Sequence, residues 1–79
     1  MMKLNILNMK NFLETVNMCK GEINMLCSDG KWLNINRQYT LQNDLLKQYK
    51  ANKKCLRLTL DIPSSHDYMR IVSYYAGDC

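Results

Sequence analysis

The sequence contains no long hydrophobic run, no proline-rich or glycine-rich linker and no internal repeat. No stretch approaches the roughly 20 consecutive apolar residues that a membrane-spanning helix needs. The N-terminal segment MMKLNILNMKNF also lacks the apolar run and small-residue cleavage site of a signal peptide. These absences predict one soluble, cytoplasmic domain over residues 1–79, with a single small core that is only marginally stabilising.

The sequence also lacks the cysteine and histidine spacings of a metal site. Its four cysteines form no C-x-x-C pair, and it has one histidine, His66. Because no export signal is present, free thiols are a better expectation than disulfide bonds. We therefore expect neither a metal nor a cofactor. Of the cysteines, Cys27 alternates with apolar positions and is expected to be a small buried side chain.

Positive charge is modest and is partly clustered. The apolar share of 47% and the charged share of 23% are those of a folded globular chain, and the net charge is +4. A nucleic-acid surface needs a broader basic face with interleaved aromatic residues, so no nucleic-acid partner is expected. Four lysines surround the end of a predicted helix, where cations interact favourably with the helix dipole and maintain solubility: Lys47, Lys50, Lys53 and Lys54.

The central predicted element is a β-hairpin over residues 22–36. Ser28, Asp29 and Gly30 supply its turn, because aspartate and glycine tolerate the left-handed backbone angles of tight hairpins. Apolar and polar residues alternate on both sides of the turn, which predicts a sheet with one buried face. The side chains expected to point inward are Ile23, Met25, Cys27, Leu33 and Ile35.

A short strand and a helix are predicted before the hairpin. The strand covers residues 3–7, and Leu4 and Ile6 share its inner face. Asn8 or Asn11 caps the helix, and Gly21 is placed to end it. Four residues at helical spacing form its apolar stripe: Phe12, Leu13, Val16 and Cys19.

A helix and a strand are predicted after the hairpin. Thr40 is a candidate N-cap for the helix, on which Asp44 and Lys47 form an exposed i,i+3 pair. The strand covers residues 55–62 and is ended by Pro63, which cannot donate to a strand ladder. The residues expected to face the core are Leu41, Leu45, Leu46 and Tyr49 on the helix and Leu56, Leu58, Leu60 and Ile62 on the strand.

A last helix completes the chain. Ser64 or Ser65 caps it, Asp67 lies near its positive end, and Gly77 stops it. Tyr68, Ile71, Val72 and Tyr75 are expected to pack inward.

The element order β-α-β-β-α-β-α predicts an α+β fold, a two-layer open-faced β-sandwich. We expect a four-stranded antiparallel sheet in the order 1-4-2-3 with three helices on one face. Trp32 and Leu26 are apolar exceptions on the outer face, and they either anchor a partner or only stabilise the hairpin as a cross-strand pair. The outer face is expected to hold Asn5, Glu22, Asn24, Leu26, Trp32, Asn34, Asn36, Arg57, Thr59 and Asp61.

A turn that ends in Gly-Lys is followed here by a strand of the form hydrophobic-Asn-hydrophobic, in the segment Gly30-Lys31-Trp32-Leu33-Asn34-Ile35. Together with the element order, this segment resembles the histidine-containing phosphocarrier (HPr) family of the bacterial sugar phosphotransferase system. The similarity to this family extends from about Phe12 onward. The resemblance implies the carrier fold for residues 1–79. A ferredoxin-like β-α-β-β-α-β sandwich with an added C-terminal helix is the main alternative.

The residues that carry the family's chemistry are missing. In the family, the loop Gly-x-His-Ala-Arg-Pro places the phosphoryl-accepting histidine at a helix N-terminus, where free N–H groups and a neighbouring arginine favour phosphate. The matching loop here is a short segment without histidine, arginine, proline or glycine, and the family's regulatory serine aligns near Arg37. The chain is therefore identified as a degenerate member. The vestigial loop residues are Asn8, Met9, Lys10 and Asn11.

The sequence contains two candidate replacements for the missing acceptor. His66 lies in the first turn of the last helix, but the antiparallel sheet puts that turn at the opposite edge from the first helix. Cys55 and Cys79 should lie on the same edge as the vestigial loop, where a thiol near the positive helix end has a lowered pKa.

The resemblance implies a non-enzymatic protein-binding or regulatory module, since the family includes members that lost the histidine but still bind regulators. Family partners dock on the first two helices, which here present Met9, Lys10, Lys47 and Lys50 to an acidic, phosphotransferase-system or regulatory protein. An active carrier with a displaced acceptor and a ferredoxin-like module that dimerises around Trp32 are the alternatives. The oligomeric state is left open, and no membrane partner is expected.

Overall fold

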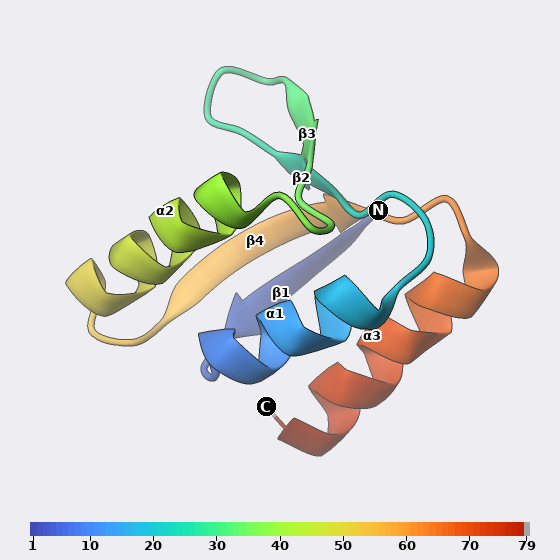
Figure 1. Cartoon of the computed structure of the whole chain (residues 1–79). Coiled ribbons are helices and arrows are strands. Elements are labelled where there is room, and N and C mark those ends of the chain that lie inside the picture. Colours follow the sequence, from blue (N-terminus) through green and yellow to red (C-terminus); the bar gives the residue numbers. More distant parts are fainter. Residues whose placement is uncertain (79) are drawn as a thin grey trace.

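The computed structural model describes the backbone of residues 1–78 and the side chains of residues 1–75. Strands β1, β4, β2 and β3 form one sheet in that order, with antiparallel pairing throughout, and three helices complete the fold (Figure 1). The predicted α+β fold and the sheet order 1-4-2-3 are confirmed. The elements are β1 (Met2–Ile6), α1 (Met9–Met18), β2 (Asn24–Leu26), β3 (Trp32–Asn34), α2 (Tyr39–Ala51), β4 (Leu56–Asp61) and α3 (Ser65–Asp78).

The strand register fixes which loops share an end of the sheet. In the β1–β4 ladder, Met2 pairs with Leu60 and Ile6 pairs with Leu56. The end of β1 therefore lies beside the start of β4, and α1 begins at this end. The start of α3 lies at the other end, because α3 follows β4.

One apolar cluster lies between the inner sheet face and the helices. The predicted inner faces of β1, α1 and β4 are confirmed, because the alternation and the helical spacing each place their residues on the buried side. The fully buried members are Ile6, Met9, Phe12, Val16, Cys19, Ile23, Ile35, Leu60 and Ile71.

The first helix begins as predicted and ends earlier than predicted. Asn8 is its N-cap, and the Asn8 Oδ1 atom accepts a hydrogen bond of 3.2 Å from the Asn11 amide. The helix ends at Met18, with the extended residue Cys19 as its C-cap, so the prediction of Gly21 as the C-cap is wrong. Gly21 has another role, since a Cβ atom at this position would lie 3.2 Å from Asp67 Oδ2.

The ends of the other two helices also differ from expectation. Gln38, not Thr40, is the N-cap of α2, and its side chain makes no capping bond. The Ser64 hydroxyl accepts a hydrogen bond of 3.3 Å from the Asp67 amide, which selects Ser64 over Ser65 as the cap of α3. Gly77 does not stop α3, which continues to Asp78.

The buried side of helix α3 agrees only in part with the predicted stripe. Tyr68 is 39% exposed, whereas Asp67 and Ile71 are buried and Tyr74 packs against the Phe12 ring at a centroid distance of 5.8 Å. Ile71 is buried as predicted, and Tyr75 packs against the core, so the prediction is wrong for Tyr68 and missed the burial of Asp67 and the packing of Tyr74. The burial of Asp67 was missed because apolar patterning assigns a charged residue to the surface.

The hairpin forms, but its outer part does not pack as predicted. Leu33 is 39% exposed and Cys27 is half-buried, although both were expected in the core. Asn36 was expected on the outer face and is buried. Because β3 ends at Asn34, strand alternation no longer governs Asn36, which turns inward toward the loop after α1.

Smaller differences concern β1 and α2. β1 begins and ends one residue earlier than predicted, and Leu7 lies beyond it, 52% exposed. Asp44 and Lys47 are both exposed on α2, but the predicted ion pair between them does not form in the described structure.

Candidate functional site

The loop between β1 and α1 is held by side chains from both other helices. The Tyr49 hydroxyl, on α2, donates a hydrogen bond of 2.6 Å to the Leu7 carbonyl. The Tyr74 hydroxyl, on α3, donates one of 3.2 Å to the Asn8 carbonyl. The start of α1 is therefore held by hydrogen bonds from α2, from α3 and from its own N-cap Asn8.

A hollow of about 500 Å³ lies beside this first turn, between α1 and the end of α2. Its floor is apolar, and Met9 is fully buried there, so the expectation that Met9 belongs to an exposed surface is wrong. The first turn of α1 contains no acidic residue, which leaves the positive end of the helix dipole uncompensated. The lining residues are Asn8, Met9, Lys10, Leu46, Tyr49, Lys50 and Lys54. We call this surface the basic hollow.

The basic hollow brings together cations from three parts of the chain. Lys10 comes from α1, Lys50 from α2 and Lys54 from the loop before β4. All three residues are exposed, and they surround the apolar floor. This arrangement attracts an anionic group, but its lining contains no histidine, cysteine, serine or carboxylate that accepts a phosphoryl group.

Arg37, aligned with the family's regulatory serine, lies at the other end of α1. Its backbone has a positive φ of 59°. The Arg37 amide donates a hydrogen bond of 3.1 Å to Asn17 Oδ1, near the C-terminal end of α1. Asn17 is also joined to the buried Gln42, whose Nε2 donates to Asn17 Oδ1 at 2.7 Å. Arg37 thus belongs to a polar junction between α1 and α2, away from the basic hollow.

The residues of the expected partner surface lie in three places. Lys10 and Lys50 line the basic hollow, whereas Lys47 is exposed on α2 outside its lining. Leu26 and Trp32 face each other across the hairpin in register, and they are 37% and 43% exposed. Neither residue lines the hollow, so the structure does not gather the five residues into one patch.

The two described alternative acceptors, His66 and Cys55, lie at opposite ends of the sheet. His66 is exposed in the first turn of α3, at the end of the sheet opposite to the basic hollow. Cys55 is half-buried directly before β4, at the same end as the hollow. Cys79 lies outside the described residues, so the pair of thiols stays a prediction.

Sequence reasoning missed the structural role of Asp67. This carboxylate is 2% exposed and accepts hydrogen bonds from the Lys20 amide at 3.2 Å and the Gly21 amide at 2.8 Å. Burial acts to raise the pKa of Asp67, but these amides outweigh it and hold the pKa below its usual value. The positive charges of His66 and Arg70 act in the same direction as the amides. Asp67 therefore closes the loop after α1 from 46 residues away.

Asn36 supports the same loop from the opposite side. Its Nδ2 atom donates hydrogen bonds of 3.0 Å to the Cys19 carbonyl and 2.7 Å to the Gly21 carbonyl. Burial and then the nearby Asp67 charge raise the pKa of the Cys19 thiol, against a smaller opposite effect of Arg70. Cys19 is therefore protonated at neutral pH and serves as a buried packing residue.

Metal-binding clusters and membrane-spanning helices are both absent from the described part of the chain. No cluster of three or more histidine, cysteine, aspartate or glutamate side chains suited to a metal ion occurs there. None of the described helices combines the length and the apolar character needed to cross a membrane.

No protein-family model, no curated protein and no solved structure matches this chain.

Proposed function

We propose that the chain is a non-catalytic binding module with an HPr-like fold, whose basic hollow binds an acidic segment of a partner protein. The single observation that carries this proposal is the convergence of Lys10, Lys50 and Lys54 on an apolar floor at the first turn of α1. A cytoplasmic, bacterial setting and a phosphotransferase-system or regulatory partner belong to the same proposal.

The combination of charge and apolar floor is what favours a protein partner. Scattered surface lysines only maintain solubility, whereas a recessed apolar surface between cations gains from being covered. The tyrosine hydrogen bonds hold the loop in place before binding, so little ordering is needed when a partner docks. Lys47, one turn before Lys50 on α2, extends the positive potential beyond the hollow.

Charge reversal in the hollow should remove partner binding. In the Lys10→Glu/Lys50→Glu variant, two attractive contacts become repulsive, and the dissociation constant should rise about tenfold or more. The measurement compares proteins captured from a bacterial lysate by the wild type and the variant, followed by titration of any captured acidic protein. Binding should weaken as salt is raised, because exposed charges are screened.

A variant of equal net charge supplies the control. Lys3 and Lys31 are also exposed lysines, and neither lines the basic hollow. The Lys3→Glu/Lys31→Glu variant should capture the same acidic protein as the wild type. Equal loss of binding in both variants would show that net charge alone governs capture, and the proposal would then be wrong.

A further inference from the structure

Strand β4 has an open edge next to the hairpin. On one side of β4, the residues from Leu56 to Leu60 pair with β1. On the other side, the ladder with β2 contains only the pairs of Asn24 with Asp61 and Met25 with Leu60. Among the described residues, the stretch from Leu56 to Leu58 therefore has no strand partner on its β2 side.

The two arms of the hairpin form hydrogen bonds with each other and not with this edge of β4. At its base, the Ile35 amide donates to the Ile23 carbonyl at 2.8 Å, and Asn34 Oδ1 accepts the Ile23 amide at 3.1 Å. At its tip, the Cys27 amide donates to the Lys31 carbonyl at 2.8 Å. The hairpin is thus closed along its length, while beyond Met25 it departs from β4 (Figure 1).

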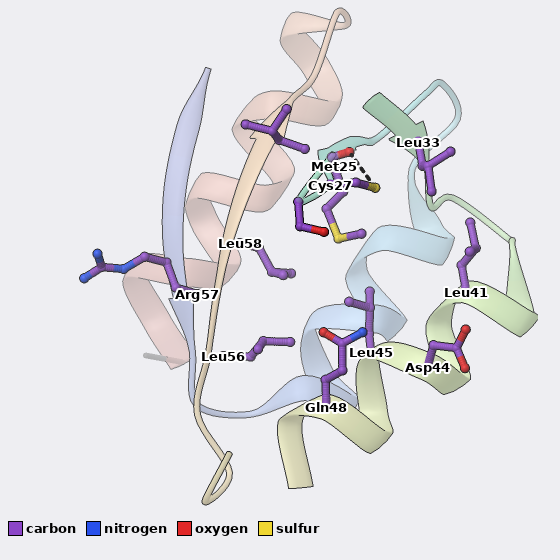
Figure 2. A pocket seen from close by; sticks show the side chains of 12 residues that line it. Met25, Cys27, Leu33, Leu41, Asp44, Leu45, Gln48, Leu56, Arg57 and Leu58 are labelled. Carbon is purple, nitrogen blue, oxygen red and sulfur yellow. Dashed lines mark hydrogen bonds between the residues drawn. The ribbon is translucent and has the colours of Figure 1, made fainter. Parts of the chain in front are cut away.

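A cleft of about 340 Å³ opens where the hairpin departs, between β2, β4 and α2 (Figure 2). Leu56 and Leu58 point from β4 toward α2, and Leu33 points from the hairpin toward Leu41, whereas Arg57 points away. The exposure of Leu33 is explained by this cleft, because its side chain lines an unfilled space instead of the core. The apolar residues of the lining are Met25, Leu26, Cys27, Leu33, Leu41, Leu45, Leu56 and Leu58.

We propose that the open edge of β4 accepts an extended segment of a partner protein as an added strand. Unpaired N–H and C=O groups along a strand edge are a template for such pairing, and alternate side chains of the added strand enter the adjoining cleft. The segment runs antiparallel to β4, as both existing neighbours of β4 do.

The charges around the cleft define the chemistry of this segment. Asp44, on α2, lines the cleft and disfavours acidic residues within it. Lys53 and Lys54 are exposed and directly precede Cys55 and the open edge. The complementary segment is therefore uncharged and alternately apolar along the cleft. It carries acidic residues at its C-terminal end, where an antiparallel strand reaches the two lysines.

Other occupants fit the cleft less well. The edge lies between the hairpin and α2, and an extended chain placed there continues the sheet where β2 leaves it. A small molecule of suitable volume would fill the apolar space but leave the strand edge without main-chain partners. The cleft itself is separate from the basic hollow, and the two sites meet only at Lys54, which lines the hollow and also lies where the acidic end of the added strand would reach.

The test uses the synthetic peptide Thr-Val-Thr-Val-Thr-Asp-Asp and amide hydrogen exchange followed by NMR. Binding should slow the exchange of alternate amides within residues 56–59. A peptide with N-methyl groups on alternate amides should not bind, because it cannot pair as a strand. The reversed peptide Asp-Asp-Thr-Val-Thr-Val-Thr should bind about fivefold more weakly, since its acidic end lies away from the lysines.

Two matched variants test whether the peptide binds in the cleft. Leu33→Asp introduces a charge into the cleft and should abolish binding, whereas Leu7→Asp alters an exposed leucine outside the cleft and should not. Circular dichroism establishes that both variants are folded. Slowed exchange along β1 or β3 instead, or equal binding of the N-methylated peptide, would overturn the proposal. Concentration-dependent protection of residues 56–59 without peptide would identify a second copy as the occupant and would also overturn it.

Discussion

Replacing Asp67 with alanine should lower the free energy of unfolding by about 3 kcal/mol. The buried carboxylate accepts the Lys20 and Gly21 amides, and alanine leaves both donors without their acceptor. Hydrogen bonds to charged groups are the stronger ones, and an unsatisfied buried donor adds a desolvation cost. Urea denaturation of the wild type and the variant measures the difference. Ser64→Ala, which removes only the α3 cap, should cost about 1 kcal/mol.

The pH dependence of stability provides a second measurement on Asp67. Its pKa is lower in the folded protein than in the unfolded chain, so its stabilising effect is fully present at neutral pH. The effect begins to fall near the ordinary aspartate pKa of about 3.9 and is lost as the pH drops through the lower folded value. The stability advantage over Asp67→Asn should therefore shrink on acidification. An advantage that is constant between neutral pH and strongly acidic pH would contradict this account.

Replacing Phe12 with alanine should cost about 3–5 kcal/mol. The ring is fully buried and packs against Tyr74, so alanine leaves a cavity in the centre of the core. A small domain has little stability in reserve, and the variant should be largely unfolded at physiological temperature. Thermal unfolding followed by circular dichroism tests this. Phe12→Leu fills most of the space and should cost under about 1.5 kcal/mol. Equal costs for both variants would show that the ring does not support the core in this way.

The parts of the fold that follow from local patterns were predictable. Leu4 and Ile6 alternate along β1, and Phe12 and Val16 recur at helical spacing, so their burial was expected from the sequence. The hairpin turn was equally readable, since Gly30 has a φ of 85° and the Lys31 amide bonds to Asp29 Oδ1. In each case, the signal and the structure lie within a few residues of each other.

The parts that depend on distant partners were not predictable. Glycine is a common residue at the end of a helix, which is why Gly21 was expected to cap α1. The helix instead ends at Met18, and the Lys20 and Gly21 amides donate hydrogen bonds to Asp67. Strand alternation places Asn36 on the outer face. Its side chain instead turns inward and donates hydrogen bonds to the Cys19 and Gly21 carbonyls after α1. Strand alternation places Leu33 in the core. It is exposed because the hairpin departs from β4 beyond Met25. No local pattern contains these contacts.

The candidate site was predicted in part. Lys10 and Lys50 were expected on one surface, and the structure places both around the basic hollow. Lys54 was expected only as a cation near the end of a helix, and the hydroxyl contact of Tyr49 with the β1–α1 loop was not foreseen. A tyrosine in an apolar stripe indicates burial of its ring, but the partner of its hydroxyl is set by the packing of separate helices.

We propose that the chain combines an HPr-like fold with a binding surface and does not accept a phosphoryl group. Intact-mass spectrometry after incubation with phosphoenolpyruvate and a bacterial enzyme I tests it most directly, with His66→Ala measured alongside the wild type. We predict no phosphoryl adduct on either protein, since the lining of the basic hollow contains no histidine, cysteine, serine or carboxylate and His66 lies at the opposite end of the sheet. An adduct on the wild type that disappears in His66→Ala would contradict the account and identify a working carrier with a relocated histidine.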